Sequence, residues 1–375
     1  MKKIQMVDLK GQYENIKSQV NESIQEVLDT NTYINGPQVH LFQENLQQYL
    51  KVKHVIPCAN GTDALQIAMM GLDLKPGDEV ITADFTFAAT VEVIALLQLT
   101  PVLVDVDADT FNISISAIEK AITSKTKAIV PVHLFGQAAN MDAIMELAQK
   151  HNLYVIEDNA QAIGANYKSA DGTKRQAGTI GHVASTSFFP SKNLGCYGDG
   201  GAIFTNDDQL AHKIRGIVNH GMYVRYHHDV VGVNSRLDSI QAGVLNAKLP
   251  KLDEYNKARQ QAAKKYSELL KHPKIITPVV TGDKDSHVFH QYTLRIIDAD
   301  RDALMQHLLD KNIPCAIYYP IPLHSQKAYA DSRYNEADFP ITNQLVKEVL
   351  SLPMHTELDD EQITFITGSI LEFLK

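Results

Sequence analysis

Residues 153–161 read Leu153-Tyr154-Val155-Ile156-Glu157-Asp158-Asn159-Ala160-Gln161, a short apolar run that ends in two adjacent carboxylates. Such a run is typical of a strand in a parallel sheet, and ligands of open parallel sheets bind beyond the carboxyl ends of the strands. Burying an ionised carboxylate costs several kcal/mol unless a cation meets it, so Asp158 requires a positive partner. A helix-capping Asp at the strand–helix turn explains Asp158 equally well when this residue is taken alone.

Similar apolar runs lie on both sides of this stretch and alternate with helical patterns. The runs cover 79–82, 101–106 and 128–132, and the helical patterns cover 62–73, 86–98, 114–122 and 139–151. This alternation predicts an α/β fold with a mostly parallel central sheet flanked by helices. Near residue 248 this alternation of strand and helix patterns ends. A long charged helical pattern (251–271) and a second α+β unit follow. We therefore predict a large domain over 1–248 and a smaller C-terminal α+β domain over 249–375.

The composition argues against several classes of protein. The 375 residues carry 35 Lys and Arg against 44 Asp and Glu, a net charge of −9, which is unlike a general nucleic-acid binder. No stretch approaches ~18 uncharged apolar residues, and the first eight residues hold no apolar signal region, so we expect no membrane partner. The three cysteines are scattered, and the pair His227-His228 lacks the spacing of metal ligands, so we expect neither a disulfide framework nor a metal. These features predict a cytoplasmic protein.

Two further segments carry residues suited to binding and catalysis. The turn Asn60-Gly61-Thr62 leads into a helix, whose N-terminus suits a phosphate, although a plain N-cap explains this turn better when it is taken alone. Lys192 lies between apolar, β-prone residues and a glycine-rich turn, where loss of solvent lowers the pKa of its amine and makes it a nucleophile. Most lysines are solvated, but the glycines and the lack of neighbouring charges argue against that here.

The three segments together predict a site for pyridoxal phosphate (PLP). Such a site needs a Schiff-base lysine, an acid at the pyridinium nitrogen and a phosphate cup. Lys192, Asp158, and the pair Gly61-Thr62 with Ser187 supply these parts. Each segment has an ordinary explanation by itself, and their combination points to the cofactor.

The chain resembles the DegT/DnrJ-type nucleotide-sugar aminotransferases, PLP enzymes of fold type I. The resemblance runs nearly end to end and rests on the motifs Asn60-Gly61-Thr62-Asp63-Ala64-Leu65, Glu157-Asp158-Asn159-Ala160-Gln161, Pro190-Ser191-Lys192 and Gly232-Val233-Asn234-Ser235-Arg236-Leu237-Asp238. More narrowly, the run 188–208, the cluster 225–228 and the run 319–323 are similar to the UDP-2-acetamido-2-deoxy-3-oxo-D-glucuronate aminotransferases of O-antigen and surface-polysaccharide biosynthesis. The resemblance implies transfer of the amino group of L-glutamate to C3 of that sugar by a homodimer with shared active sites.

The resemblance also implies roles for individual residues around the cofactor. Phe87 would stack on the cofactor ring, Gln161 would hydrogen-bond the ring hydroxyl, and Asp63 belongs to the cofactor-binding motif at the helix start. Phe87 has an alternative as an ordinary core residue. His133, which follows a predicted strand, either borders the cofactor or is a buried histidine with its hydrogen bonds satisfied.

The remaining implied roles concern the partner subunit and the substrate. Asn234 would reach across the dimer interface to the partner's cofactor phosphate, and Arg236 would meet an anionic part of the substrate. Their alternatives are a turn residue for Asn234 and a weak surface ion pair for Arg236. Tyr318, Tyr319 and His324 would lie at the sugar pocket. This chain has Tyr318 and His324 where the subgroup has His and Asn, so the exact sugar stays open.

Other functions remain possible from the sequence. A related enzyme could aminate a dTDP- or UDP-linked 3- or 4-keto-6-deoxyhexose. A PLP-dependent sugar dehydratase would replace the lysine or carry an iron–sulfur cluster, whereas Lys192 is present and three cysteines cannot supply four thiolates. A non-catalytic regulatory protein on the same scaffold would have no need for Lys192, Asp158 and Gln161 together.

Overall fold

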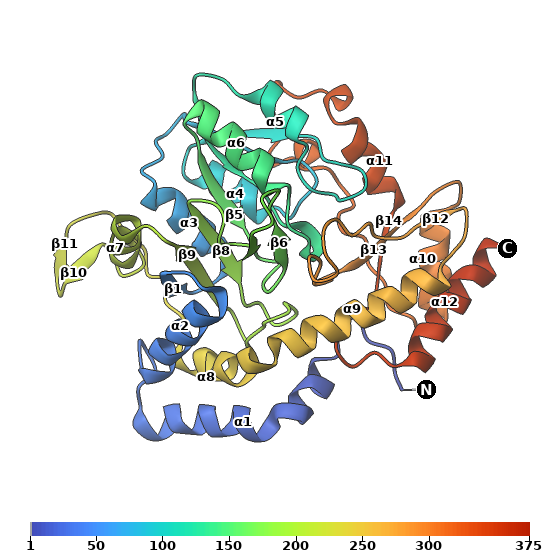
Figure 1. Ribbon diagram of the computed structural model, residues 1–375, viewed down its shortest axis with the longest axis horizontal. Coiled ribbons are helices and arrows are strands. Elements are labelled where there is room, and N and C mark those ends of the chain that lie inside the picture. Colours follow the sequence, from blue (N-terminus) through green and yellow to red (C-terminus); the bar gives the residue numbers. More distant parts are fainter. Residues whose placement is uncertain (1) are drawn as a thin grey trace.

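A seven-stranded sheet forms the centre of the molecule in a computed structural model that describes residues 2–375 (Figure 1). Its strand order is β1-β9-β8-β5-β4-β2-β3. The bounds are β1 His54–Cys58, β2 Glu79–Ala83, β3 Thr100–Val104, β4 Thr126–Val130, β5 Tyr154–Asp158, β8 Val183–Ser187 and β9 Gly201–Thr205. Strands β3, β2, β4, β5 and β8 run parallel, and β9 pairs antiparallel with both β8 and β1. The predicted mostly parallel sheet is confirmed.

Helices cover both faces of this sheet, as predicted. Two adjacent residues of β4, Ala128 and Ile129, point to opposite faces of the sheet. Both are fully buried, and they belong to different hydrophobic clusters, so both faces are covered. The helices between the strands are α3 Gly61–Gly71, α4 Ala89–Leu96, α5 Ile115–Ala121, α6 Met141–His151 and α7 Asp208–Ile217. The side chains of Asn60 and Asn140 accept a backbone N–H at the starts of α3 and α6. The pattern over 86–98 overestimates its helix, since α4 begins at Ala89 and leaves Phe87 in the preceding loop.

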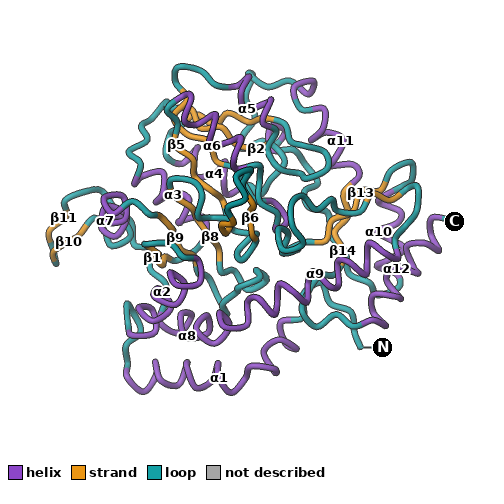
Figure 2. The backbone as a smooth tube through the Cα atoms, viewed as in Figure 1, coloured by secondary structure: helices purple, strands orange, loops and turns teal. Residues whose placement is uncertain are grey.

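Four helices form a layer beside the sheet and lead to the C-terminal part (Figure 2). They are α1 Leu9–Thr30, α2 Pro37–Leu50, α8 Ser239–Lys248 and α9 Leu252–Leu269. Helices α1 and α2 both pack on α8, and α9 runs from there toward the C-terminal unit. The helix α9 confirms the long charged helix expected over 251–271.

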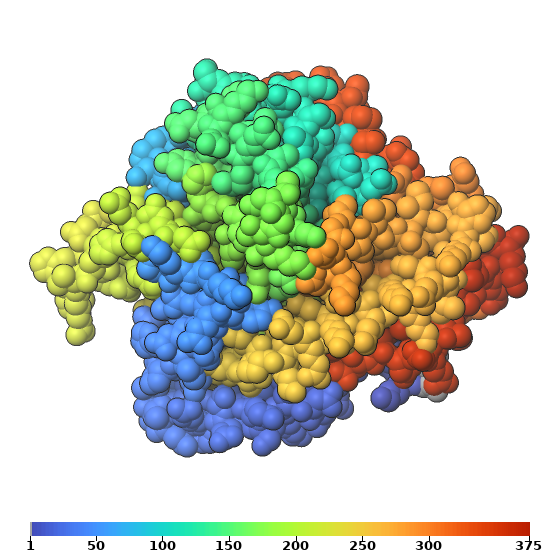
Figure 3. Space-filling model, viewed as in Figure 1, coloured from blue at the N-terminus to red at the C-terminus, as the bar shows by residue number. Residues whose placement is uncertain are grey.

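Two short hairpins form separate two-stranded sheets. One consists of β6 Asn166–Lys168 and β7 Lys174–Gln176, and the other of β10 Met222–Val224 and β11 His227–His228. Figure 3 shows the second hairpin standing clear of the molecular surface at the left. Its Val224 and Tyr226 are exposed.

The C-terminal part contains a small antiparallel sheet, in line with the predicted α+β unit. The sheet orders β12 Ile275–Ile276, β13 Tyr292–Ile296 and β14 Val349–Leu352, and the helices are α10 Arg301–Asp310, α11 Pro340–Glu348 and α12 Asp360–Leu374. Short 3-10 turns lie at η1 Leu134–Gly136, η2 Leu249–Lys251, η3 Leu323–Ser325 and η4 Glu336–Asp338. Ile4 packs in the same core as Tyr266 and Tyr292, so the start of the chain contributes to this unit. The division at residue 248 stays a prediction. Within residues 2–375, no helix is long and apolar enough to cross a membrane.

Candidate active site

A cavity of about 660 Å³ opens near the carboxyl ends of β5 and β8 and reaches the C-terminal segment that contains Tyr319. This is where open parallel sheets bind ligands. The predicted site residues that line it are Gly61, Thr62, Phe87, Asp158, Gln161, Ser187, Lys192, Tyr318 and Tyr319. Residues more than 250 positions apart in the sequence therefore share one cavity.

Lys192 enters the cavity from the turn that follows β8. The turn is held by its own backbone, since Lys192 N–H donates to the Phe189 carbonyl at 2.8 Å. A buried lysine, Lys248, donates from Nζ to the Gly195 carbonyl at 2.7 Å and secures the other end of the turn. Burial lowers the pKa of Lys192 to about 8, and the negative charge of Asp158 opposes that shift. Lys192 is therefore closer to its neutral, nucleophilic form at pH 7 than a solvated lysine.

Asp158 is the last residue of β5 and is 5% exposed. Its Oδ2 accepts a hydrogen bond from Thr90 Oγ1 at 2.8 Å, and its Oδ1 accepts one from Ala160 N–H at 3.1 Å. No helix begins at this turn, so helix capping does not explain the residue. Thr90 was missed in the sequence analysis, because nothing local to α4 indicates that its hydroxyl faces the end of a distant strand.

The start of α3, where we predict the phosphate seat, lies beside Ser187. Asn60 Oδ1 accepts the N–H of Asp63 at 2.8 Å, while the first N–H groups of a helix, here those of Gly61 and Thr62, have no intrahelical acceptor. A Cβ at position 61 would lie 2.6 Å from Ser187 Cβ, so only glycine allows α3 and β8 to come this close. The seat thus combines free donors, a hydroxyl and the positive end of a helix.

Gln161 and Phe87 meet Tyr319 across the cavity. Gln161 Oε1 accepts the N–H of Phe135 at 2.7 Å, and Gln161 Nε2 donates to the Tyr319 hydroxyl at 3.2 Å. The ring of Phe87 lies 6.3 Å from that of Tyr319 between centroids, and 58% of the Phe87 side chain is exposed. Phe87 is therefore an open aromatic surface and not a core residue. Phe135, which also lines the cavity, was missed by sequence reasoning.

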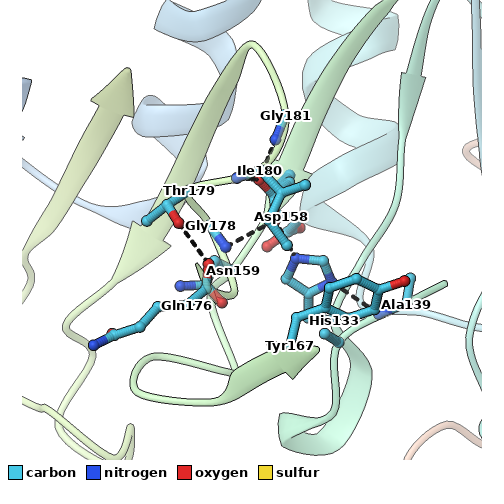
Figure 4. Close-up of polar contacts among 12 residues, drawn as sticks. His133, Ala139, Asp158, Asn159, Tyr167, Gln176, Gly178, Thr179, Ile180 and Gly181 are labelled. Carbon is cyan, nitrogen blue, oxygen red and sulfur yellow. Dashed lines mark hydrogen bonds and ion pairs between the residues drawn. The ribbon is translucent and has the colours of Figure 1, made fainter. Parts of the chain in front are cut away.

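Glu157, the neighbour of Asp158 in the sequence, forms a fully buried pair with His133, and Figure 4 shows His133 and Ala139 together with Gly178, Ile180 and Gly181. Glu157 Oε2 lies 2.8 Å from His133 Nε2, and its carboxylate also accepts the N–H groups of Gly178, Ile180 and Gly181 at 2.6–2.8 Å. His133 Nδ1 accepts the N–H of Ala139, so Nε2 carries the proton that is donated to Glu157. His133 is thus the satisfied buried histidine of the two alternatives, and it does not line the cavity.

The structure does not bring four predicted residues into the cavity. Asp63 instead accepts a hydrogen bond from Ser235 Oγ at 2.6 Å, which ties α3 to the segment containing Asn234 and Arg236. Asn234 and Arg236 line a second cavity of about 450 Å³, and Asp199 lines both cavities. His324 is buried and its ring donates to Asp84. His324 stays outside the cavity because its backbone N–H and its ring Nδ1–H both donate to the Asp84 carboxylate.

The residues present fit PLP. Lys192 and Asp158 line one cavity. Position 61 has no room for a side chain, and the backbone N–H groups at this helix start are free to bind a phosphate. An exposed aromatic ring, Phe87, offers a face for a planar ring system. This set of groups on a mostly parallel α/β sheet defines the class of PLP-dependent enzymes of fold type I.

Comparisons with known proteins identify the family. Residues 14–371 match the model of the DegT/DnrJ/EryC1/StrS aminotransferase family, and the chain belongs to this family. The UDP-2-acetamido-2-deoxy-3-oxo-D-glucuronate aminotransferase of Pseudomonas aeruginosa is 47% identical over 98% of this chain and 99% of its own length. A pleiotropic regulatory protein of Geobacillus stearothermophilus is 45% identical over 99% of each chain. The crystal structure of DesV from S. venezuelae in complex with a ketimine intermediate matches 100% of this chain and 99% of its own with a TM-score of 0.94 and 38% identity.

These findings confirm the predicted family, fold class, cofactor and type of enzyme. The chain is a PLP-dependent aminotransferase of nucleotide sugars. The roles assigned to single side chains remain predictions, and so do the donor, the exact sugar and the dimer.

Proposed function

We propose that this enzyme transfers the amino group of L-glutamate to C3 of UDP-2-acetamido-2-deoxy-3-oxo-D-glucuronate. The observation that carries the proposal is the cavity shared by Lys192, Asp158 and the start of α3, in a chain 47% identical to an aminotransferase named for that substrate. The proposal includes a role in O-antigen or surface-polysaccharide biosynthesis. It also includes a cytoplasmic location, which three buried free cysteines support because thiols stay reduced there.

Each residue of the cavity has one task in this proposal. PLP, when bound, supplies the electron sink that lets an amino group pass from donor to acceptor. Asp158 would hold a proton at the ring nitrogen through a charge-assisted hydrogen bond, and the N–H groups at Gly61 and Thr62 would hold the phosphate with Ser187. The Lys192 amine would accept the proton from the α-carbon of the amino donor and deliver it to the cofactor carbon on the other side of the transferred nitrogen, a 1,3-proton shift.

The proposed enzyme is a homodimer in which each cavity is completed by its partner. Asn234 and Arg236 line a second cavity of their own chain and are not among the residues that line the cavity of Lys192. In a dimer, Asn234 would reach the cofactor phosphate of the opposite subunit and Arg236 would meet an anionic group of its substrate. The projecting hairpin 222–228 exposes Val224 and Tyr226, which supports an interface there.

A second candidate acceptor is a neutral dTDP- or UDP-linked 3- or 4-keto-6-deoxyhexose. One observation favours it: among the described residues that line the 660 Å³ cavity, Lys192 is the only Lys, Arg or His. Among these lining residues, a uronate carboxylate therefore finds no counter-ion besides Lys192, whereas a neutral sugar needs none. Arg236 from a partner subunit would remove this objection.

An absorption spectrum of the PLP-loaded protein tests the proposal. Addition of L-glutamate should convert the visible band of the bound cofactor to the pyridoxamine form. Subsequent addition of UDP-2-acetamido-2-deoxy-3-oxo-D-glucuronate should restore the band. Nucleotides of keto-6-deoxyhexoses are tested separately as alternative amino acceptors. Recovery with only a keto-6-deoxyhexose would overturn the uronate proposal, and no response to glutamate would overturn the choice of donor.

Replacement of Lys192 tests the catalytic assignment. We expect Lys192→Ala to reduce kcat by roughly 10³-fold or more, because the proton shift loses its acid–base group. The matched control is Lys264→Ala, which removes an exposed lysine of α9 and should leave kcat unchanged. Near-normal turnover by Lys192→Ala would contradict the assignment.

A further inference from the structure

His324 and Asp84 form a buried contact between two segments that are 240 positions apart. Asp84 Oδ2 accepts the ring Nδ1–H of His324 at 2.7 Å, and Asp84 Oδ1 accepts the backbone N–H of His324 at 2.7 Å. The Leu323 N–H also donates to the Asp84 carbonyl, at 3.3 Å. We refer to these three bonds between Asp84 and residues 323–324 as the clasp.

The clasp determines the orientation of the His324 ring. The ring stacks on Phe339 with 4.3 Å between centroids and 9° between planes. Its Nε2 lies 3.6 Å from Glu336 Oε1, which is too long for a hydrogen bond, so Nδ1 makes the directional contact. The side chain of His324 is 5% exposed and that of Asp84 is fully buried, so neither lies where substrate could reach it.

Stability alone is a poor explanation for this contact. Burial raises the pKa of Asp84 and the bonds from His324 oppose that shift, as expected for a carboxylate that has lost its water. A buried ion pair of this kind is often no more stabilising than apolar residues of similar volume. What an apolar pair could not provide is the directional restraint of two bonds from one residue to one carboxylate.

The two segments that meet in the clasp both continue into the cavity. Three residues after Asp84 lies Phe87, and five residues before His324 lies Tyr319, and the rings of these two residues face each other at 6.3 Å. Phe85, next to Asp84, packs edge-on against Tyr319 at 5.9 Å. On its other side, Tyr319 is held by Gln161. The clasp is thus a polar link between the segment that carries Phe87 and the segment that carries Tyr318 and Tyr319.

We propose that His324 is a positioning residue that, through Asp84, sets the separation of Phe87 from Tyr318 and Tyr319 and thereby the affinity for the nucleotide sugar. It acts through Nδ1 and does not touch the substrate, in contrast to the role that the sequence predicted for it. The inference rests on the proposed function only in taking Tyr318 and Tyr319 as the sugar-facing wall.

Two amide substitutions distinguish the role of the His324 ring Nδ1 from that of its Nε2. An Asn side chain can place its NH₂ near the position of His Nδ1, whereas a Gln side chain places it near Nε2. We expect His324→Asn to keep the clasp and a KM for the sugar within about twofold of wild type. We expect His324→Gln to lose the clasp and to raise that KM about tenfold or more, while kcat and the half-reaction with L-glutamate change little. Glu336→Gln, at an exposed side chain, is the matched control and should leave KM unchanged.

Hydrogen exchange gives a readout that does not depend on the identity of the sugar. Peptides spanning 317–324 and 84–88 should exchange faster in His324→Gln than in wild type and His324→Asn, with or without cofactor. If the proposed sugar is not the substrate, neither the wild type nor the variants will respond to the uronate, but the difference in hydrogen exchange will persist. Failure of the proposed function and failure of the positioning role are therefore distinguishable.

Three outcomes would overturn the positioning role. A normal His324→Gln with an impaired His324→Asn would show that Nε2 contacts the substrate. Unchanged KM and exchange in both variants would show that the clasp positions nothing. Equal loss of the glutamate and sugar half-reactions, with a lowered melting temperature, would assign His324 to stability alone.

Discussion

Lys192 experiences two opposing electrostatic effects in the same cavity. Loss of water lowers the pKa of its amine to about 8, and the nearby Asp158 raises it again. Thr90 and the Ala160 N–H hold the Asp158 carboxylate in place, so the balance is set by fixed groups. These neighbouring groups therefore determine the protonation of the amine that we predict to condense with the cofactor.

The rate of PLP incorporation into the cofactor-free protein should follow this balance. Neutral amine is the reactive form, so the rate should rise with pH and level off above a midpoint near 8, well below the 10.5 of an ordinary lysine. Removing the opposing charge with Asp158→Asn should move the midpoint to lower pH. Stopped-flow absorbance from pH 6.5 to 10 measures both, and a midpoint above 10 would refute the depressed pKa.

At the scale of elements, the site depends on how closely α3 approaches β8. A strand–turn–helix pattern predicts that α3 exists and where it starts, because Asn60 is a good N-cap. Its approach to Ser187, close enough to exclude a Cβ, follows from the packing of the whole sheet.

Gly61→Ala should weaken cofactor binding. The added Cβ would meet Ser187 Cβ at 2.6 Å and push the helix start away, so we expect the Kd for PLP to rise roughly tenfold or more. Equilibrium dialysis or fluorescence titration measures the Kd. Gly368→Ala is the matched control in α12, where an added Cβ meets nothing within 4 Å, and it should leave the Kd unaltered.

The Glu157–His133 pair joins the ends of β4 and β5 to the loop 178–181. Burial by itself would raise the pKa of Glu157, but the hydrogen bonds from His133 and from backbone N–H groups lower it below the ordinary value of 4.5. A depressed carboxylate pKa stabilises the fold above the unfolded pKa, and this contribution disappears as pH falls through the folded one.

Glu157→Ala should lower the free energy of unfolding by roughly 3–5 kcal/mol at pH 7, because His133 and three backbone donors lose their acceptor. Urea denaturation measures it. The difference from wild type should be constant from pH 6 to 8 and shrink below about 4.5. A difference that grows on acidification would mean that Glu157 is protonated in the fold at neutral pH. Glu119→Ala, which removes an exposed carboxylate of α5, should cost little.

At the scale of the whole molecule, two of the predicted site residues, Asn234 and Arg236, lie outside the cavity that contains Lys192. Asp63 and Ser235 connect the phosphate seat to the segment that contains Asn234 and Arg236, yet those two side chains line another cavity. A two-fold axis that brings this segment to the partner's cavity would complete both sites, since a two-fold interface is self-complementary.

Mixing two inactive variants tests shared sites. Lys192→Ala disables the cavity of its own chain, and Asn234→Asp would place a negative charge at the phosphate of the partner's cavity. Random pairing makes half of the dimers mixed with one intact site each, so about a quarter of wild-type activity should return after subunit exchange. A mixture of Lys192→Ala with Lys192→Met is the control and should stay inactive. Failure to recover activity with Asn234→Asp, although mixed dimers form, would place Asn234 in its own chain's site.

The sequence by itself determined the elements and the chemical groups. Apolar runs such as 153–157 and the N-cap Asn60 predict strands and a helix start from interactions within a few residues, and β5 and α3 confirm them. Lys192, Asp158 and Gly61 were recognisable because a PLP site needs those residue types, and a family resemblance supplied Phe87 and Gln161. The helix predicted over 86–98 is too long at both ends, since α4 covers Ala89–Leu96 and Phe87 lies in the preceding loop, where its ring lies near that of Tyr319, far along the chain.

Only the tertiary structure decided which side chains meet. Thr90 on Asp158, Gln161 on Tyr319 and Asp84 on His324 are contacts between residues 68, 158 and 240 positions apart. Local patterns carry no information about such pairs, because the geometry that brings them together is set by the packing of the sheet against its helices. For the same reason, the family resemblance placed His324 at the sugar pocket, whereas its burial against Asp84, outside the cavity that Tyr318 and Tyr319 line, could not be predicted.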